Sequence, residues 1–545
     1  MTQRSASRWR AGFGHALTGA ALLAAALAFV PFTDGDWAWN EEPIRLAWAI
    51  GGTLAFAAAW IAGAGIRRRA ARGTARDDLP LQADGPLPVF HASQTGYAQW
   101  LAERTAQALR EAGIAAQARA LESLDAATLE TLPRALFVAS TTGEGDAPDP
   151  VAGFVRRVLG ARAALSGLRY GLLALGDRHY QRYCAFGRRL DGWLADQGAE
   201  RLFPRIEVDN ADAVALEVWR HALGRLTGAA TLPDWQPAPW QTWRLARRDH
   251  LNPGSLGEPT FHLELLPEVG PMPAWRAGDI AEILPQHGAD AIAQWLVAAG
   301  LDGSSPIRNA DGEQTLGARL SCCELPDPAQ VRGWNAQQVA EALVELRGRD
   351  YSIASLPTDG HLDLLIRQGH RPDGSLGLGA GWLTAHLPVD GKVRLRLRSN
   401  PNFHAPAQDG PLILIGNGTG LAGLRALLHE RIAQGRHANW LLFGERQRGC
   451  DFYHGAELEA ALAAGQLAHL DLAFSRDQPQ RRHVQHALAE QGERLKAWMD
   501  AGAVIQVCGS LSGMAGGVDA VLRGLLGDAQ VQQLTEAGRY RRDVY

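Results

Sequence analysis

Leu87-Pro88-Val89-Phe90 leads into Ser93-Gln94-Thr95-Gly96-Tyr97-Ala98, and this stretch decides the fold of the first half of the chain. Two further apolar runs, Arg134 to Ala139 and Tyr170 to Leu175, also end in polar loops, and segments with helical spacing lie between the runs. Continuous apolar runs that alternate with helices are typical of a parallel sheet covered on both faces. The pattern therefore predicts an α/β, doubly wound domain.

The loops that follow these runs predict a binding crevice. The first loop opens a helix, where hydroxyls and backbone N–H groups favour a phosphate, and it carries no Lys or Arg. One such turn alone is often only a helix cap, but loops at the carboxyl ends of neighbouring strands meet at one crevice. The side chain of Tyr180 or Tyr183 would pack against a flat ligand ring there. The candidate residues are Ser93, Gln94, Thr95, Gly96, Tyr97, Ala98, Ser140, Thr141, Thr142, Gly143, Leu175, Gly176, Asp177, Tyr180, Tyr183 and Cys184.

Length and composition set limits on the class of protein. The 545 residues are enough for three or four domains, and the net charge of −4 gives no reason to expect nucleic-acid binding. The five cysteines show no C-x-x-C spacing, so we expect no metal site, iron–sulfur cluster or disulfide framework.

The N-terminus predicts a membrane anchor. Gly14 to Phe32 and Ile44 to Ile66 are almost entirely apolar, and each is long enough to cross a hydrocarbon core of roughly 30 Å as a helix. Arginines flank the pair on both outer sides, and acidic residues lie between the two runs. Positive flanks stay inside, so the expectation is a two-pass protein of the inner (cytoplasmic) membrane with cytoplasmic catalytic domains. The alternative is a cleaved signal peptide followed by a core helix.

A Pro- and Trp-rich stretch, Leu232 to Trp243, marks a boundary, and shorter strands with two helical blocks follow it. A second alternating strand and helix series runs from Pro411 to the C-terminus. It begins with a buried strand that enters a glycine-rich turn, where the backbone can approach a pyrophosphate. The residues of that turn are Gly416, Gly418, Thr419 and Gly420.

A later group of cations suits the 2′-phosphate of NADPH, because guanidinium pairs well with phosphate. A solvated charged surface is the alternative. The group comprises Ser475, Arg476, Arg481, Arg482, His483 and Gln485.

Together these motifs resemble the diflavin reductases, the family of the sulfite reductase flavoproteins and the NADPH–hemoprotein reductases. The three early loops resemble flavodoxins, which implies FMN in their crevice. Arg349-Asp350-Tyr351-Ser352 resembles the R-x-Y-S strand of ferredoxin–NADP reductase-like barrels, supported upstream by Trp275 to Asp279. The resemblance implies FAD at Arg349, Asp350, Tyr351, Ser352, Gly377, Leu378, Gly379, Ala380 and Tyr545. It implies a hydride-transfer set of Ser352, Cys508, Asp543 and Tyr545, with Cys508 and Gly509 beside the nicotinamide.

Several positions depart from the family pattern. Thr142 stands where some relatives have Tyr, and Ala380 and Gly381 replace Ser or Thr. The other departures are His483 for Tyr, and Ser510 and Gly517 for Asp.

The expected organisation is a transmembrane hairpin (1–70), a linker (71–86), a flavodoxin-like FMN domain (87–228), an FAD-binding barrel with a short helical insert (229–409) and an NADPH-binding Rossmann-like lobe (410–545). The expected activity is hydride transfer from NADPH to FAD, then single-electron transfer through FMN to a heme protein, either a siroheme subunit or a membrane heme protein. Three alternatives stay open: a membrane-tethered sulfite reductase flavoprotein subunit, a ferric or quinone reductase, and a non-catalytic flavin-binding sensor. The oligomeric state is not predicted.

Overall fold

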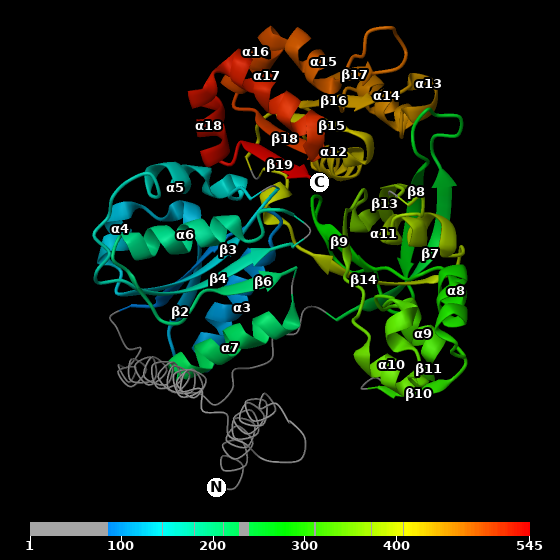
Figure 1. The fold of residues 1–545 in the computed structure, drawn as a ribbon. Helices are drawn as coiled ribbons and strands as arrows, with labels where there is room; N and C mark the ends of the chain where they lie inside the picture. Colours follow the sequence, from blue (N-terminus) through cyan, green and yellow to red (C-terminus); the bar gives the residue numbers. More distant parts are fainter. Residues whose placement is uncertain are drawn as a thin grey trace, which may run out of the picture. The chain divides into compact units, whose positions relative to one another are not determined.

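The computed structural model describes residues 85–143, 145–178, 180–210, 212–227, 239–309, 312–371, 373–406 and 408–545. Three large sheets and one two-stranded hairpin organise these residues (Figure 1). The first and third large sheets are parallel and carry helices on both faces, whereas the second is antiparallel.

The first sheet has the order β2-β1-β3-β4-β5, and β6 pairs with β4. Its strands are β1 Leu87–Ala92, β2 Ala116–Ala120, β3 Arg134–Ser140, β4 Arg169–Gly176, β5 Glu200–Arg201 and β6 Ile206–Asp209. Its helices are α3 Tyr97–Glu111, α4 Ala126–Thr131, α5 Ala152–Arg157, α6 Ala185–Asp196 and α7 Ala213–Thr227. Figure 1 shows α4, α5 and α6 on one face and α3 and α7 on the other. Two covered faces explain why β1, β3 and β4 are apolar almost without interruption.

The second sheet is antiparallel, with the order β12-β9-β14-β7-β8-β13. Its strands are β7 Gln241–His250, β8 Thr260–Pro267, β9 Ile280–Leu284, β12 Arg349–Ser352, β13 Leu362–Arg367 and β14 Lys392–Arg398. Just beyond β12, the N–H of Ala354 donates to the carbonyl of Asp363 in β13 at 2.9 Å. This bond joins the two ends of the sheet, which we call the barrel, around a core that contains Trp243 and Leu263.

A helical insert with its own small core separates β9 from β12. It contains α8 Ala289–Ala299, β10 Pro306–Asn309, β11 Gly312–Thr315, α9 Leu316–Ser321 and α10 Ala336–Ala342. After β13, the short helix α11 Leu378–Gly381 precedes β14.

The third sheet is parallel, with the order β17-β16-β15-β18-β19. Its strands are β15 Leu412–Asn417, β16 Asn439–Glu445, β17 His469–Phe474, β18 Val504–Gly509 and β19 Tyr540–Val544. The helices are α12 Leu421–Ala433, α13 Arg448–Asp451, α14 Gly455–Ala463, α15 Val484–Glu490, α16 Gly492–Asp500, α17 Gly516–Leu526 and α18 Asp528–Glu536. One core packs α12 and α14 against the sheet, and a second packs α15 to α18 against its other face.

The predicted transmembrane hairpin is wrong, and with it the two-pass topology and the inner-membrane localisation. Among the described residues no helix is long and apolar enough to span a bilayer. The longest of these helices, α3 and α7, have 15 residues each, which is about 22 Å of helix against a core of roughly 30 Å. The runs Gly14 to Phe32 and Ile44 to Ile66 lie outside the described residues. The architecture is mixed α/β, with flavodoxin-like and nucleotide-binding parts.

Candidate active site

The three loops predicted to form one crevice do lie together. They follow β1, β3 and β4, which are neighbours in the first sheet. The hydroxyl of Ser140 donates to the carbonyl of Ala92 at 2.8 Å, and the N–H of Thr141 donates to the carbonyl of Leu175 at 3.0 Å. These bonds hold the carboxyl ends of the three strands at one edge.

The first loop has the geometry of an anion site. Gly96 has a φ of +82°, and a Cβ at this position would lie 2.5 Å from the carbonyl oxygen of Ser399. A glycine is therefore required where the loop enters α3, whose free N–H groups point into the loop. Gln94 faces elsewhere: its amide donates to Asp149 at 3.2 Å and to the carbonyl of Arg542 at 2.9 Å.

The aromatic residues of the third loop are divided between two environments. Tyr180 is 48% exposed, so its ring is free to cover a flat ligand. The ring of Tyr183 instead lies between the guanidiniums of Arg178 and Arg188, at 5.3 and 5.5 Å. Cys184 is buried in the domain core, where its thiol donates to the carbonyl of Ala174 at 3.4 Å. Of the two tyrosines predicted to flank a flat ligand, Tyr180 is thus the better placed. Cys184 packs in the core.

A cavity of about 470 Å³ lies where the barrel strands, the glycine-rich turn and the C-terminus meet. This volume is within the range of cofactor sites. Strand β12 contributes Tyr351 and Ser352 to the wall, and the last strand contributes Asp543. Other predicted residues that line it are Thr95, Asp350, Ala380, Gly418, Thr419 and Tyr545.

The predicted FAD residues on β12 pack against the loop that contains α11. A Cβ on Gly379 would lie 2.5 Å from the hydroxyl of Tyr351 and 3.0 Å from Cγ of Arg349, so only a glycine lets the two segments approach this closely. Asp350 pairs with Arg398. Within the described part of the chain, the exposed guanidinium of Arg349 donates from Nη1 to the carbonyls of Arg347 and Gly348, which leaves its other donors for a phosphate.

The predicted hydride-transfer residues converge on one carboxylate. The hydroxyl of Ser352 donates to Oδ2 of Asp543 at 3.0 Å, and the thiol of Cys508 lies 3.9 Å from the same oxygen. Burial, followed by the charge of Asp543, raises the pKa of the Cys508 thiol far above its ordinary value. Burial also raises the pKa of Asp543, against the hydrogen bond from Ser352. Cys508 is therefore a neutral thiol rather than a nucleophile.

The glycine-rich turn is fixed against β18. A Cβ on Gly420 would lie 2.2 Å from the carbonyl oxygen of Cys508, and one on Gly416 would lie 2.6 Å from it. The hydroxyl of Thr419 lies 3.2 Å from that of Tyr545. These contacts place the turn, Cys508 and the C-terminal residue around the same space.

Among the predicted cations after β17, some are exposed and one is held in an ion pair. Arg476 and Arg481 are exposed, and Ser475 is buried. Desolvation, then the positive charges of His486, Arg481 and Arg476, lowers the pKa of His483, so this side chain adds no cation at neutral pH.

Two members of that predicted group have protein neighbours of their own. The guanidinium of Arg482 forms an ion pair with Glu490 at 2.6 Å. A Cβ on Gly517 would lie 2.9 Å from the amide nitrogen of Gln485, so this glutamine occupies the space beside the position where the family has Asp.

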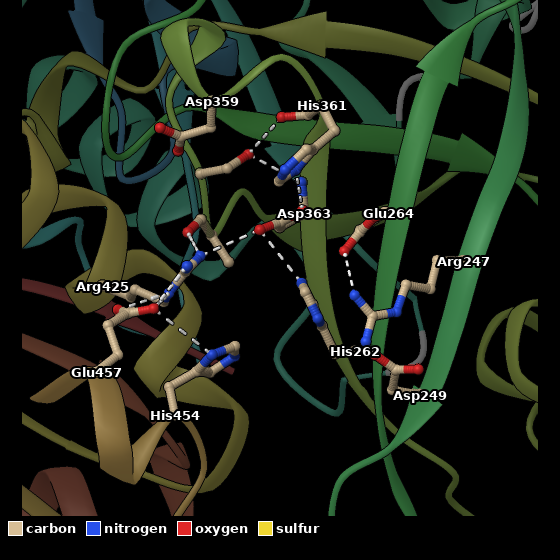
Figure 2. Close-up of polar contacts among 12 residues, drawn as sticks. Arg247, Asp249, His262, Glu264, Asp359, His361, Asp363, Arg425, His454 and Glu457 are labelled. Carbon is tan, nitrogen blue, oxygen red and sulfur yellow. Dashed lines mark hydrogen bonds and ion pairs between the residues drawn. The ribbon is translucent and has the colours of Figure 1, made fainter.

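A network of charged residues joins β8 and β13 of the barrel to α12 and α14. Figure 2 shows Asp363 receiving contacts from His361 at 2.6 Å, His262 at 3.2 Å and Arg425 at 3.1 Å. Arg425 also binds Glu457 of α14 at 2.8 Å. Burial raises the pKa of Glu457, but hydrogen bonds from His429 and Arg425 outweigh it and lower the pKa to about 2.

Among the polar residues that line the cavity, three are not in the predicted site set: Arg367, Asn417 and Ser510. The side-chain oxygen of Asn417 accepts from the N–H of Ser510 at 3.0 Å, which ties the glycine-rich turn to the loop after β18. A polar residue at the end of an apolar strand, as Arg367 is, was the available signal.

Comparison with known proteins matches both nucleotide-binding parts. The family described as Flavodoxin matches residues 89–219, and the family described as Oxidoreductase NAD-binding domain matches residues 414–520.

Curated relatives match most of the chain. A sulfite reductase (NADPH) flavoprotein alpha-component of Vibrio cholerae is 30% identical, over 85% of this chain and 88% of its own length. The proteins of the same name from Mannheimia succiniciproducens and Neisseria meningitidis are each 28% identical, over 92% and 89% of this chain and 97% and 95% of their own lengths. The chain thus belongs to the diflavin reductase family of these sulfite reductase flavoproteins, and it is a flavoprotein oxidoreductase.

Proposed function

We propose that this protein is an NADPH-dependent diflavin oxidoreductase that delivers electrons to a heme protein. The bound flavins would supply the redox chemistry: FAD accepts a hydride from NADPH, and FMN passes single electrons onward. The proposal rests on the gathering of Ser352, Asp543 and Tyr545 at one cavity that also reaches Thr95 of the first loop. The buried thiol of Cys508 lies 3.9 Å from the carboxylate of Asp543.

The residues present fit the three groups. The loops after β1, β3 and β4 would hold FMN, with α3 beneath its phosphate and Tyr180 beside its ring. Arg349, Tyr351 and the Gly377–Ala380 loop would hold FAD, and the close approach at Gly379 keeps that loop next to β12. The glycine-rich turn, with Arg476 and Arg481, would hold NADPH. We propose the corresponding domain limits as 87–228, 229–409 and 410–545.

At the hydride site the chain's own groups act by orientation and charge. Asp543 accepts from Ser352 and so fixes the direction of that hydroxyl. With a nicotinamide bound at this site, its carboxylate would stabilise the positive charge that develops as the ring gives up a hydride, because negative charge placed there in advance lowers the barrier. Cys508 is fully buried and packs beneath the same site. Tyr545 lines the cavity, and its hydroxyl forms a hydrogen bond with that of Thr419.

The proposal has two candidates for the heme protein that accepts the electrons. A general heme protein is the first candidate. A siroheme subunit is the second, favoured by the relatives named sulfite reductase flavoprotein over most of the chain. An NADPH-driven assay with cytochrome c and with a purified siroheme subunit separates the two. Fast reduction of cytochrome c with no reduction of the siroheme subunit would favour the first.

A non-catalytic flavin-binding sensor is the alternative of another class. It predicts no NADPH oxidation with any acceptor, ferricyanide included. Turnover with ferricyanide that requires NADPH would exclude the sensor, and its complete absence in flavin-loaded protein would overturn the proposed function.

A further inference from the structure

Two adjacent cysteines, Cys322 and Cys323, lie in the helical insert, away from the residues that line the cavity. They come directly after α9, and Cys322 is the C-terminal cap of that helix. Cys323 is fully buried in the small core of the insert, whereas Cys322 is partly exposed. Both are free thiols. The pair therefore presents one thiol to solvent and keeps a second thiol next to it.

Hydrogen bonds hold the backbone of the pair in place. The N–H of Leu346 donates to the carbonyl of Cys322 at 2.8 Å, and the N–H of Cys323 donates to the carbonyl of Leu320 at 3.3 Å. On the other side, Nε2 of His287 lies 3.0 Å from the carbonyl oxygen of Cys323. The two thiols are thus attached to a fixed stretch of chain.

The two thiols differ in acidity. Sγ of Cys322 contacts the carbonyl oxygen of Arg319 at 3.3 Å. A hydrogen bond from Cys323 lowers the pKa of the Cys322 thiol against the effect of burial, and the positive charges of Arg319 and Arg394 lower it further. The same hydrogen bond, together with burial, raises the pKa of the Cys323 thiol. An accessible thiolate with a second thiol beside it is the arrangement that oxidants attack most readily.

Arg319 is placed to stabilise negative charge on the pair. Its side chain is 13% exposed, and Nη1 forms an ion pair with Glu345 at 2.8 Å. The guanidinium is close enough to both thiols for their charges to interact. Among the described residues, Nε of Arg319 is buried and has no hydrogen-bond partner. A buried donor without an acceptor costs free energy, so this N–H is available to a thiolate or to an oxygen bound to sulfur.

We propose that Cys322 and Cys323 form a reversible dithiol site that reacts with hydroperoxides. The thiolate of Cys322 attacks one oxygen of hydrogen peroxide and the O–O bond breaks, which leaves a sulfenic acid on Cys322 and a hydroxide that takes up the thiol proton as water. The thiol of Cys323 then attacks the sulfur of Cys322, the S–S bond forms, and the sulfenic oxygen leaves as a second water. The two thiols lose two electrons, and the peroxide gains them.

A disulfide between adjacent residues is easily reduced. Neighbouring Cα atoms are about 3.8 Å apart across a trans peptide, which is shorter than the roughly 4.4–6.8 Å that a disulfide usually spans. The resulting strain makes the bond labile, and labile disulfides are those that switch rather than those that stabilise a fold. A thiol reductant should therefore restore the pair.

The test is treatment of the full chain with hydrogen peroxide, followed by a count of free thiols in the denatured protein and by peptide mass spectrometry. We expect the loss of two of the five thiols, a peptide in which Cys322 is joined to Cys323, and full recovery with dithiothreitol. Cys450→Ser is the matched control, because Cys450 is a single, partly exposed cysteine of α13. This variant should be oxidised at the wild-type rate.

Two further variants separate the roles of the two thiols. Cys323→Ser should stop the reaction at the sulfenic acid of Cys322, which dimedone traps, and Cys322→Ser should leave Cys323 reduced. Since Cys323 is buried and its replacement can destabilise the insert, the peptide map of the wild type decides the matter without it. The inference would be overturned by a wild type in which both thiols stay reduced, in which Cys450 is oxidised first, or in which Cys322 proceeds to a sulfinic acid while Cys323 stays free.

Discussion

At the scale of single residues, Asp543 connects the groups around the hydride site. It accepts from Ser352 and lies beside the thiol of Cys508. For Asp543→Asn we expect flavin reduction by NADPH to slow by about 10²-fold, because charge and orientation at the site are both lost. Stopped-flow absorbance measures this rate. NADP⁺ affinity should change little, and Asp500→Asn, an exposed acid at the end of α16, should reduce flavin at the wild-type rate.

Nucleotide choice is also decided by single side chains. Arg476 is exposed beside His483, whereas Arg482 is held by Glu490. We expect Arg476→Ala to raise the KM for NADPH about tenfold or more and to leave the KM for NADH unchanged, since only NADPH carries the 2′-phosphate. Arg482→Ala should have a smaller effect. An equal rise for NADPH and NADH in Arg476→Ala would contradict the role given to this residue.

The motifs predicted which residues gather but not how each side chain is used. Ser352, Cys508 and Asp543 were predicted together, and they meet within hydrogen-bonding or near-contact distance. Cys184 was predicted at the flavin crevice but lies in the core, and Arg367 was not predicted at all. The position of Cys184 depends on contacts with elements distant along the chain, and for Arg367 the end of an apolar strand was the only local signal.

At the scale of elements, the apolar runs predicted the parallel strands closely. Leu87 to Phe90 became β1 Leu87–Ala92, and Arg134 to Ala139 became β3 Arg134–Ser140. Burial on both faces makes such strands apolar throughout, and this signal is local. Strands β7 and β8 of the barrel mix buried and more exposed positions, so their bounds were less evident from the sequence.

The contact between the glycine-rich turn and β18 leads to a prediction about stability. Gly420→Ala would place a Cβ 2.2 Å from the carbonyl oxygen of Cys508, so we expect a loss of about 1–3 kcal/mol in the free energy of unfolding. Urea unfolding followed by circular dichroism measures it. Gly524→Ala on α17, where a Cβ meets nothing within 4 Å, should be neutral or stabilising by about 0.5–1 kcal/mol. Equal stability of the two variants would contradict the packing described here.

The network in Figure 2 makes the junction between barrel and nucleotide lobe dependent on pH. The pKa of Glu457 is lowered from 4.5 to about 2 in the folded protein. The contribution of ionised Glu457 to the free energy of unfolding is therefore present above about pH 4.5 and is lost as the pH falls toward 2.

For Glu457→Gln we expect a loss of about 1–2 kcal/mol at pH 7, less than for a fully buried pair because the side chain is 35% exposed. The difference from the wild type should shrink near pH 3, which thermal unfolding at the two pH values measures. Glu459→Gln on the same helix, 53% exposed, should change stability little at either pH. A difference that does not depend on pH would contradict the role of this carboxylate.

At the scale of the whole molecule, the flavodoxin-like and NAD-binding parts match known families where the sequence predicted them, whereas the predicted membrane anchor is wrong. Three polar loops in sequence, a barrel strand and a glycine-rich turn are separate signals, and together they indicate one family, which the relatives confirm. The prediction of an anchor rested on the apolar runs and their flanking charges, and no helix in the described ranges is long and apolar enough to span a bilayer. Agreement among independent motifs was therefore the better guide.

The central claim is that one polypeptide carries two flavins and reduces them with NADPH. Anaerobic titration of the purified full chain with NADPH, after release and quantification of its flavins, tests the claim directly. We predict FAD and FMN in equal amounts, and bleaching of the flavin absorbance that is complete after about two equivalents of NADPH, because each flavin accepts two electrons. A single kind of flavin, or flavin absorbance that NADPH leaves unchanged, would contradict the account.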